Sequence, residues 1–205
     1  MPQHGPEPGT ILNETGVPTE PRQAATVLVV RGGSERLEVL LAQRTPKAKF
    51  MGGAWVFPGG AVDAEEDHRV AGVREVLEEA SVALPDAEAL IEFSRWITPA
   101  QVKIRFDTRF FLVAAPADAA PVADGGEVVE LGWFAPREAL AAYERDEILL
   151  VFPTIKTLEQ LAPFASAGEL LAWATGREVV AVEPRVVMEG EVARVVLPGE
   201  PGYEA

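Results

Sequence analysis

Residues 59 to 82 of this 205-residue chain read GGAVDAEEDHRVAGVREVLEEASV. Two glycines open the segment, and apolar residues then recur at the spacing of an α-helix, which we expect from about Glu66 to Ala80. The apolar stripe of this helix comprises Val70, Val73, Val76, Leu77 and Ala80. Because such a stripe is the face by which a helix packs onto a protein core, we expect these side chains to be buried.

Three glutamates lie close together within the predicted helix. Glu75, Glu78 and Glu79 have the i, i+3, i+4 spacing that places side chains on one helical face, and at about 100° per residue that face points away from the apolar stripe. Three such carboxylates repel and raise one another's pKa unless a cation intervenes, and oxygen ligands are those that magnesium selects. A run of glutamates can also be a solvated helix surface, so the surrounding residues must decide between the two interpretations.

The spacing around the glutamates resembles the Nudix box. That motif is a glycine, five residues, a glutamate, seven residues, and then Arg-Glu-aliphatic-x-Glu-Glu-x-Gly-aliphatic. The matching residues here are Gly60, Glu66, Arg74, Glu75, Val76, Glu78, Glu79 and Val82. Ser81 departs from the pattern, because the family has glycine there, and a glycine would suit a left-handed residue that closes the helix. By this resemblance the chain is identified as a member of the Nudix hydrolases.

The resemblance implies a metal-dependent enzyme. Glu75, Glu78 and Glu79 would hold one or more Mg²⁺ (or Mn²⁺) ions, which shield the charge of a diphosphate and lower the pKa of a bound water. Arg74 would pair with Glu66 or with one of the metal-binding carboxylates and fix its orientation. The expected reaction is hydrolysis of a diphosphate bond in a nucleoside diphosphate derivative.

Further residues are expected near this site. Gly59 and Gly60 would let the loop backbone come close to its neighbours and to the metal site, because glycine has no side chain in the way. A carboxylate from a later loop often completes the site in this family, and Glu127 and Glu130 are in the right region. We prefer Glu127, because Glu130 lies within a predicted strand.

Residues outside the box suggest a substrate. Residues 40–60 resemble the coenzyme A diphosphatases, with Lys49 in place of the usual arginine and Thr45 in place of a serine or alanine. Residues 49–57 and 105–111 resemble the peroxisomal branch of that family. This resemblance implies that coenzyme A or an acyl-coenzyme A is cut into 3',5'-ADP and (acyl-)phosphopantetheine. Arg44, Lys47 and Lys49 would bind it, and the two lysines offer cations to its 3'-phosphate. ADP-ribose or another nucleotide sugar is the alternative substrate, and a catalytically inactive ligand-sensing module is the alternative from another functional class.

The whole chain predicts an α/β fold with a mixed sheet. The first 23 residues are rich in proline and glycine, so we expect a flexible tail or arm there, followed by a Nudix hydrolase domain over residues 24–205 with a C-terminal extension from about residue 165. Strand patterns cover residues 26–30, 37–41, 54–57, 96–113, 128–134, 179–187 and 192–197, and further helix patterns cover 137–144, 154–161 and 169–174. Because these elements do not alternate strictly, we predict a Nudix-type α/β/α sandwich with extra C-terminal helices and a β-hairpin.

Bulk composition excludes several function classes. A formal net charge of -14 would repel a nucleic-acid backbone, and the absence of cysteine excludes disulfides and thiolate metal sites. No stretch has the roughly 20 apolar residues of a membrane span, and the N-terminus lacks the pattern of a signal peptide. We therefore expect a soluble, cytoplasmic protein that binds a small nucleoside diphosphate derivative and neither nucleic acid nor membrane. The apolar β segments after Val179 exceed what a minimal Nudix domain needs, which predicts a homodimer.

Overall fold

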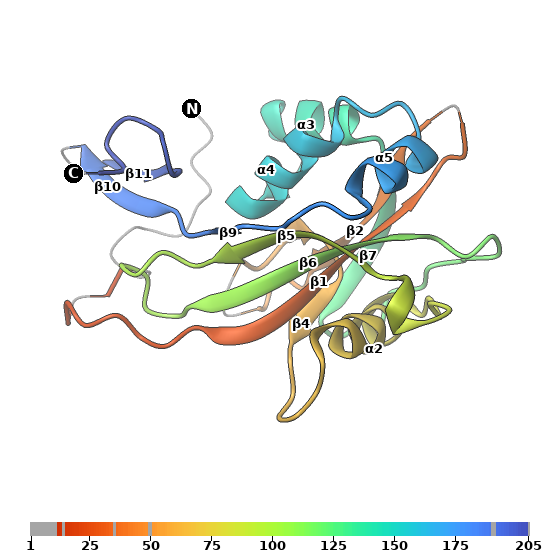
Figure 1. The fold of residues 1–205 in the computed structure, drawn as a ribbon, viewed down its shortest axis with the longest axis horizontal. Coiled ribbons are helices and arrows are strands. Elements are labelled where there is room, and N and C mark those ends of the chain that lie inside the picture. The colour runs from red at the N-terminus through yellow and green to blue at the C-terminus, as the bar shows by residue number, and fades with distance from the viewer. Residues whose placement is uncertain (1–11, 14, 35, 49–50, 190–191, 205) are drawn as a thin grey trace.

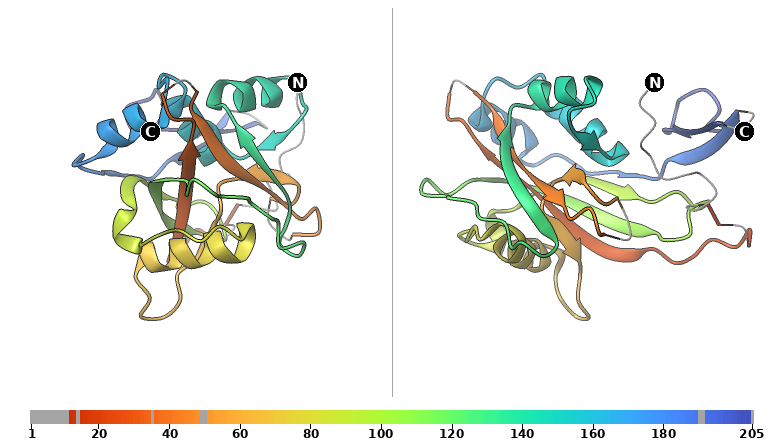
Figure 2. Two further views of the ribbon diagram at one scale, coloured as in Figure 1. Left: turned by 90° about the vertical axis from the view of Figure 1, so that its right-hand side faces the viewer. Right: turned by 180° about the vertical axis from the view of Figure 1, so that it is seen from behind.

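The computed structural model describes residues 12–13, 15–34, 36–48, 51–189 and 192–204. A mixed β-sheet forms its middle layer and helices cover both faces of that sheet (Figure 1). Helix α2 (His68–Ala80) lies on one face, whereas α3 (Pro136–Glu144), α4 (Phe152–Leu161) and α5 (Ala167–Ala174) lie on the other, as the turned views in Figure 2 also show. The predicted α/β/α sandwich is confirmed.

The described strands form one large sheet and one small one. The large sheet contains β1 (Arg22–Arg31), β2 (Glu38–Arg44), β3 (Ala54–Val56), β4 (Gly59–Ala61), β5 (Ile91–Ile97), β6 (Phe106–Ala114), β7 (Val128–Phe134), β8 (Leu149–Leu150) and β9 (Ala181–Val182). Its order is β8-β3-β2-β1-β6-β5-β9, with β4 paired to β1 and β7 paired to β2. The small sheet is the hairpin of β10 (Arg185–Glu189) and β11 (Val192–Val196).

Strand β1 is the centre of the fold. It pairs in parallel with β6 from the Arg22–Phe106 pair to the Val30–Ala114 pair, and a short 3₁₀ turn (Ala87–Ala89) and β5 lie between α2 and β6 in the chain. A strand covered on both faces reads as a continuous apolar run rather than an alternating one, which explains the valines and leucine from Val27 to Val30. All four of these side chains are buried.

Alternate residues of β1 enter two separate cores. Val27 and Val29 pack under α2 with Val76 and Phe111, and Leu28 and Val30 pack on the opposite face with side chains from α4 and α5. The sheet thus has α2 attached to one face by its own core. The remaining helices enclose a second core on the other face.

Several element boundaries differ from the sequence-based prediction. Pro58-Gly59-Gly60 was expected only to end a strand, but Gly59–Ala61 form β4, which pairs with β1 and thereby fixes the start of the glycine loop. The strand predicted over residues 96–113 is two strands, β5 and β6, joined by a loop. Strand β1 begins at Arg22, two residues before the expected domain start.

The predicted buried stripe of α2 was wrong at two positions. Val70 is 48% exposed and Leu77 is 51% exposed, whereas Ala71, Gly72 and Val76 face the sheet. A Cβ added to Gly72 would lie 2.8 Å from Val27 Cγ2, so α2 approaches the sheet through its smallest residues. Pattern reading gives weight to large apolar residues and therefore misjudged the rotation of the helix. One consequence is that Glu79 lies partly on the buried side.

The C-terminal extension folds onto its own domain. Strand β9 pairs in parallel with β5, at the Arg95–Ala181 and Trp96–Val182 pairs, and so covers an edge of the large sheet. Because β9 of the same chain pairs with this edge, the edge gives less reason to expect a homodimer. The homodimer stays a prediction. Within the described residues, no helix combines the length and the apolar character that crossing a membrane requires.

Candidate active site

Helix α2 carries the candidate active site and has well-defined ends. Asp67 caps its start, because the Asp67 side chain accepts a hydrogen bond from the Arg69 N–H at 2.8 Å, and the helix therefore begins two residues after the predicted start. Ser81 follows its last turn with φ of 55°, in the left-handed conformation, and its N–H donates to the Leu77 carbonyl. The position that holds glycine in the Nudix box thus has the backbone conformation that glycine would favour.

Glu79 is the most buried carboxylate of the site. Its side chain is 7% exposed and accepts a hydrogen bond from the Gly59 N–H at 2.9 Å, which ties the helix to the glycine loop. Burial raises the pKa of Glu79 to about 7. The charges of Glu75 and Glu127 contribute to this rise in pKa, and the Gly59 hydrogen bond and the charge of Arg44 oppose it. A buried carboxylate with acidic neighbours and a raised pKa is a group that a bound cation would stabilise in its ionised form.

Glu75 lies against the second glycine of the loop. A Cβ on Gly60 would be 2.5 Å from the Glu75 carboxyl carbon, a distance that no side chain could occupy. Burial raises the pKa of Glu75, and the charges of Glu78 and Glu127 act in the same direction, whereas its hydrogen bond from Arg74 lowers it. Gly60 therefore serves as the space into which this carboxylate fits.

Arg74 joins three carboxylates. Its Nε and Nη2 donate to the two oxygens of Glu66 at 3.1 and 2.9 Å, and Nη1 donates to Glu75 at 2.8 Å and to Glu78 at 3.2 Å. The sequence suggested either Glu66 or a metal-binding carboxylate as its partner, and the structure has both. The hydrogen bond from Arg74 is the main cause of a lowered pKa at Glu66. One guanidinium group thus orients Glu75 and Glu78, two of the three glutamates predicted to bind metal.

Glu127, in the loop before β7, acts on the same carboxylates. It directly precedes β7, its carbonyl accepts the Thr45 N–H at 2.8 Å, and its charge raises the pKa of both Glu75 and Glu79. Asp124 shapes this loop, because its carboxylate accepts the N–H of residues 126, 127 and 128. Glu130 instead lies within β7, opposite Gln43 of β2.

The candidate substrate-binding residues lie at the end of β2 and beyond it. Arg44 is the last residue of β2, and its charge lowers the pKa of Glu79. Its Nε is buried and has no hydrogen-bond partner among the described residues. Lys47 is exposed in the following loop, and Lys49 lies outside the described residues. A buried guanidinium N–H beside the carboxylates is a donor that a phosphate oxygen would satisfy.

Comparison with known proteins identifies the family. The sequence model of a protein family, the NUDIX domain, matches residues 20–153 of this chain, which is more than half of its length. The chain belongs to the Nudix family. Putative nudix hydrolase 7 of Caenorhabditis elegans is 28% identical in an alignment of 180 residues that covers 69% of this chain and 60% of that protein. The human acyl-coenzyme A diphosphatase NUDT19 is 33% identical in an alignment of 124 residues that covers 58% of this chain.

The matched proteins differ from this chain in length. The chain spans 60% of the nematode relative and 33% of the human one.

A crystal structure of a NUDIX hydrolase from Alicyclobacillus acidocaldarius aligns with a TM-score of 0.67 at 27% identity, over 75% of this chain and 96% of that one. The classification as a Nudix hydrolase made from the box is therefore confirmed.

The carboxylates of the Nudix helix are ligands of the type that a divalent metal prefers, but they do not already surround a metal position. Among the described residues, no three acidic or histidine side chains stand in the arrangement of a ready-made metal site. Arg74 bonds to Glu75 and Glu78, and Glu79 is turned toward Gly59. Magnesium commonly keeps several waters and is held by one or two carboxylates together with substrate phosphates, so a closed cage is not required. Burial, together with neighbouring carboxylate charges, raises the pKa of both Glu75 and Glu79, and this is the feature that favours a cation here.

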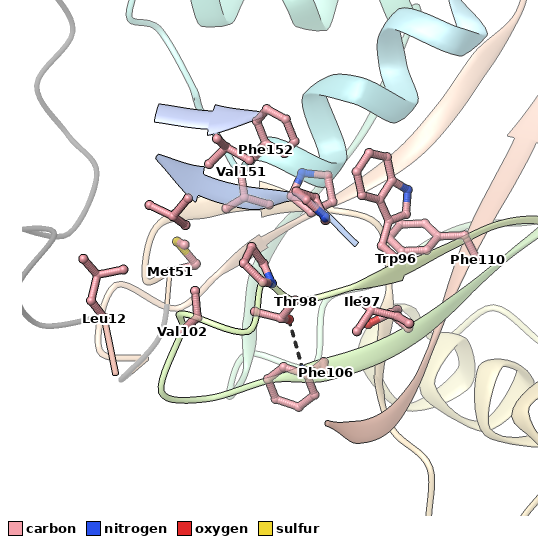
Figure 3. A pocket seen from close by; sticks show the side chains of 16 residues that line it. Leu12, Met51, Trp96, Ile97, Thr98, Val102, Phe106, Phe110, Val151 and Phe152 are labelled. Carbon is pink, nitrogen blue, oxygen red and sulfur yellow. Dashed lines mark hydrogen bonds between the residues drawn. The ribbon is translucent and has the colours of Figure 1, made fainter. Parts of the chain in front are cut away.

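Sequence reasoning missed a pocket on the opposite face of the Nudix sheet. Apolar side chains from β5, β6, the start of α4 and the C-terminal hairpin surround a cavity of about 450 Å³ (Figure 3). Phe106 and Phe110 lie on the same face of β6 and form part of one wall of the pocket, and their spacing is visible in the sequence. The opposing wall comes from segments about 40 to 90 residues further along the chain, which no local pattern could bring together.

Proposed function

We propose that this chain hydrolyses the diphosphate bond of coenzyme A or acyl-coenzyme A, with a divalent metal ion, to give 3',5'-ADP and (acyl-)phosphopantetheine. The observation that carries the proposal is the position of Glu75 against Gly60 and of Glu79 on the Gly59 N–H, with the charge of Glu127 acting on both carboxylates and that of Arg44 on Glu79. Hydrolysis adds water to one phosphorus and breaks its bond to the bridging oxygen. The leaving phosphate takes that oxygen with it.

The side chains of the site divide this work. A divalent ion held by Glu75, Glu78 and Glu79 would neutralise the diphosphate charge and make water more acidic beside the reacting phosphorus. Arg74 holds Glu75 and Glu78 in place through its 2.8 and 3.2 Å hydrogen bonds. Arg44 offers its unpartnered Nε to a phosphate oxygen, and Glu127 supplies a further carboxylate for metal binding or proton transfer.

Two observations support the coenzyme A part of the proposal. Residues 40–60 resemble the coenzyme A diphosphatases, and a relative named as an acyl-coenzyme A diphosphatase is 33% identical over 124 residues. Lys47 is an exposed cation in the loop after Arg44, and Lys49 is two residues further on. On a chain with a net charge of -14, this local pair of cations offers a contact to the 3'-phosphate of coenzyme A.

The test is a comparison of kcat/KM for coenzyme A, dephospho-coenzyme A, ADP-ribose and NADH, each with Mg²⁺ and with Mn²⁺. A charge-assisted contact to the 3'-phosphate should favour coenzyme A over dephospho-coenzyme A by roughly tenfold or more. Lys49→Ala and Lys47→Ala should reduce this ratio. A preference for ADP-ribose by more than about tenfold would show that the coenzyme A assignment is wrong.

Variants of the carboxylates test the catalytic part separately. Glu78→Gln and Glu79→Gln should each lower kcat by at least about a hundredfold, because a metal-binding carboxylate loses its charge. Glu127→Gln should also lower kcat, and Glu130→Gln, within the β7 strand that follows Glu127, is its matched control. If the wild-type protein binds one of these compounds and cuts none of them with either metal, the hydrolase proposal fails and the ligand-sensing alternative is correct.

A further inference from the structure

The pocket behind the sheet is almost entirely apolar. Its walls include Trp96 of β5, Phe110 of β6, Phe152 of α4, and Val186 and Val195 of the C-terminal hairpin. Figure 3 shows Met51, Val151 and Phe152 gathered around the same space as the β5 and β6 side chains. A volume of about 450 Å³ is within the range of small-molecule sites.

The polar groups of the pocket are few and partly occupied. Thr98, Thr108 and Trp96 provide the polar side-chain atoms of the described lining. The Thr98 hydroxyl already accepts the Phe106 N–H at 3.0 Å. A nucleobase or a phosphate placed here would lose more hydrogen bonds to water than Thr98, Thr108 and Trp96 Nε1, unpartnered among the described residues, can replace, whereas a hydrocarbon chain would lose none. The chemistry of the lining therefore selects an aliphatic group.

The C-terminal wall of the pocket is fixed by a buried arginine. Arg105 is 8% exposed and donates to the Thr98 carbonyl at 2.9 Å, to the Thr19 carbonyl at 2.8 Å and to Glu183 Oε1 at 2.6 Å. Tyr203 Oη donates to the Glu183 carbonyl at 2.9 Å. Glu183 directly precedes Pro184 and β10, so these contacts hold the hairpin over the pocket. A wall held in this way gives the cavity a preformed shape.

The pocket and the carboxylate site are neighbours through two short connections. Phe110 of the pocket packs edge to face on Phe57 at 6.4 Å between ring centroids, and the glycine that binds Glu79 is two residues after Phe57. The loop that begins after Arg44 also contributes Met51 to the pocket. The Phe57–Phe110 contact thus joins a wall of the pocket to the segment that holds Glu79, as a substrate with its diphosphate at the carboxylates and its other end in the cavity would require.

We infer that this pocket binds the acyl chain of an acyl-coenzyme A and that the β10–β11 hairpin sets the chain length it accepts. This inference rests on the proposed function and narrows its substrate class from coenzyme A in general to its acyl esters. Each methylene group buried should improve KM by up to about fourfold, so selectivity should rise with chain length until the cavity is full.

The experiment measures kcat/KM for coenzyme A, butyryl-coenzyme A and octanoyl-coenzyme A with the full chain and Mg²⁺. We expect octanoyl-coenzyme A to exceed coenzyme A by at least about tenfold, mainly through KM. Val186→Glu, which places a charge in the pocket, should reduce the ratio of the two substrates toward one. Met188→Glu is the control, because Met188 lies on the same strand, is 50% exposed and does not line the pocket.

A binding measurement separates this inference from the proposed function. Calorimetric titration of the Glu78→Gln variant with octanoyl-coenzyme A and with coenzyme A should show the same preference without turnover, and adding Val186→Ser should weaken it even if Val186→Glu fails to fold. If coenzyme A is cut but its acyl esters gain nothing in KM or binding, the pocket assignment is wrong and the proposed function stands. If none of these compounds is cut or bound, both are wrong.

Discussion

Glu79 is a buried carboxyl group whose pKa the fold raises toward neutral pH. Burial raises its pKa from 4.5 to about 7, so between these pH values the folded chain binds a proton that the unfolded chain releases. Without metal, the contribution of Glu79 to the free energy of unfolding should therefore be favourable below about pH 4.5. It should fall as pH rises, by up to about 3 kcal/mol near pH 7 and above.

Glu79→Gln isolates this effect from all other titrating groups. In a metal chelator, the variant should gain stability over the wild type as pH rises from about 5 to about 8, measured by urea denaturation at each pH. Added Mg²⁺ should stabilise the wild type at high pH and have less effect on the variant. Glu88→Gln, in the 3₁₀ turn after α2, is the control and should show no such trend. A difference that stays constant with pH would mean that Glu79 is not held in the protonated form.

Gly60 controls the position of the Glu75 carboxylate. An alanine Cβ at Gly60 would approach the Glu75 carboxyl carbon to 2.5 Å, so the carboxylate must move. We expect Gly60→Ala to lower kcat/KM by about a hundredfold, because a displacement of about 1 Å at a catalytic group has effects of that size. The thermal midpoint should change little. Gly168→Ala in α5 is the matched control, since a Cβ there meets nothing within 4 Å, and its activity should equal that of the wild type.

At the scale of the element, α2 shows what local sequence can and cannot predict. Its end after Ala80 and the grouping of Glu75, Glu78 and Glu79 follow from spacing along the chain, whereas its start lies two residues after the predicted one. The rotation of α2 about its own axis could not be predicted in this way, because it depends on the packing of Gly72 against Val27, and these residues are 45 positions apart in the sequence. The same limit applies to β4, whose residues read as a turn and become a strand only by pairing with β1.

The end of α2 offers a stability test at Ser81. Its φ of 55° places a non-glycine residue in the left-handed region, which costs about 1 kcal/mol. Ser81→Gly should therefore stabilise the protein by about 0.5 to 1 kcal/mol in chemical denaturation, after allowance for the greater freedom of glycine in the unfolded chain. Ser81→Ala should give no gain. Equal stability of the glycine and alanine variants would show that this conformation carries no strain.

At the scale of the whole molecule, the family core and the C-terminal extension depend on each other. The matched family region ends at residue 153, yet β9 completes one edge of the main sheet and the hairpin closes the apolar pocket. The sequence predicted strands in this extension but not their place, because the contact between Arg105 and Glu183 joins residues 78 positions apart. Local patterns can predict strands, and only the folded chain shows what they cover.

A variant of Arg105 tests whether the contact between the family core and the C-terminal extension stabilises the molecule. Replacing it with methionine keeps the aliphatic stem but removes three hydrogen-bonded donors from a buried position, and leaves the Thr19 and Thr98 carbonyls without this partner. We expect a loss of about 2 to 4 kcal/mol and faster proteolysis of the C-terminal segment, because the hairpin loses its anchor. Arg145→Met is the control, because Arg145 is 58% exposed and pairs only with Glu147 among the contacts of 4 Å or less that the described residues make. This variant should lose far less stability than Arg105→Met, because an exposed ion pair contributes little. Equal losses in the two variants would mean that Arg105 does not join the extension to the core. A loss of stability without faster C-terminal cleavage would mean that β9 and the surrounding packing hold the hairpin without it.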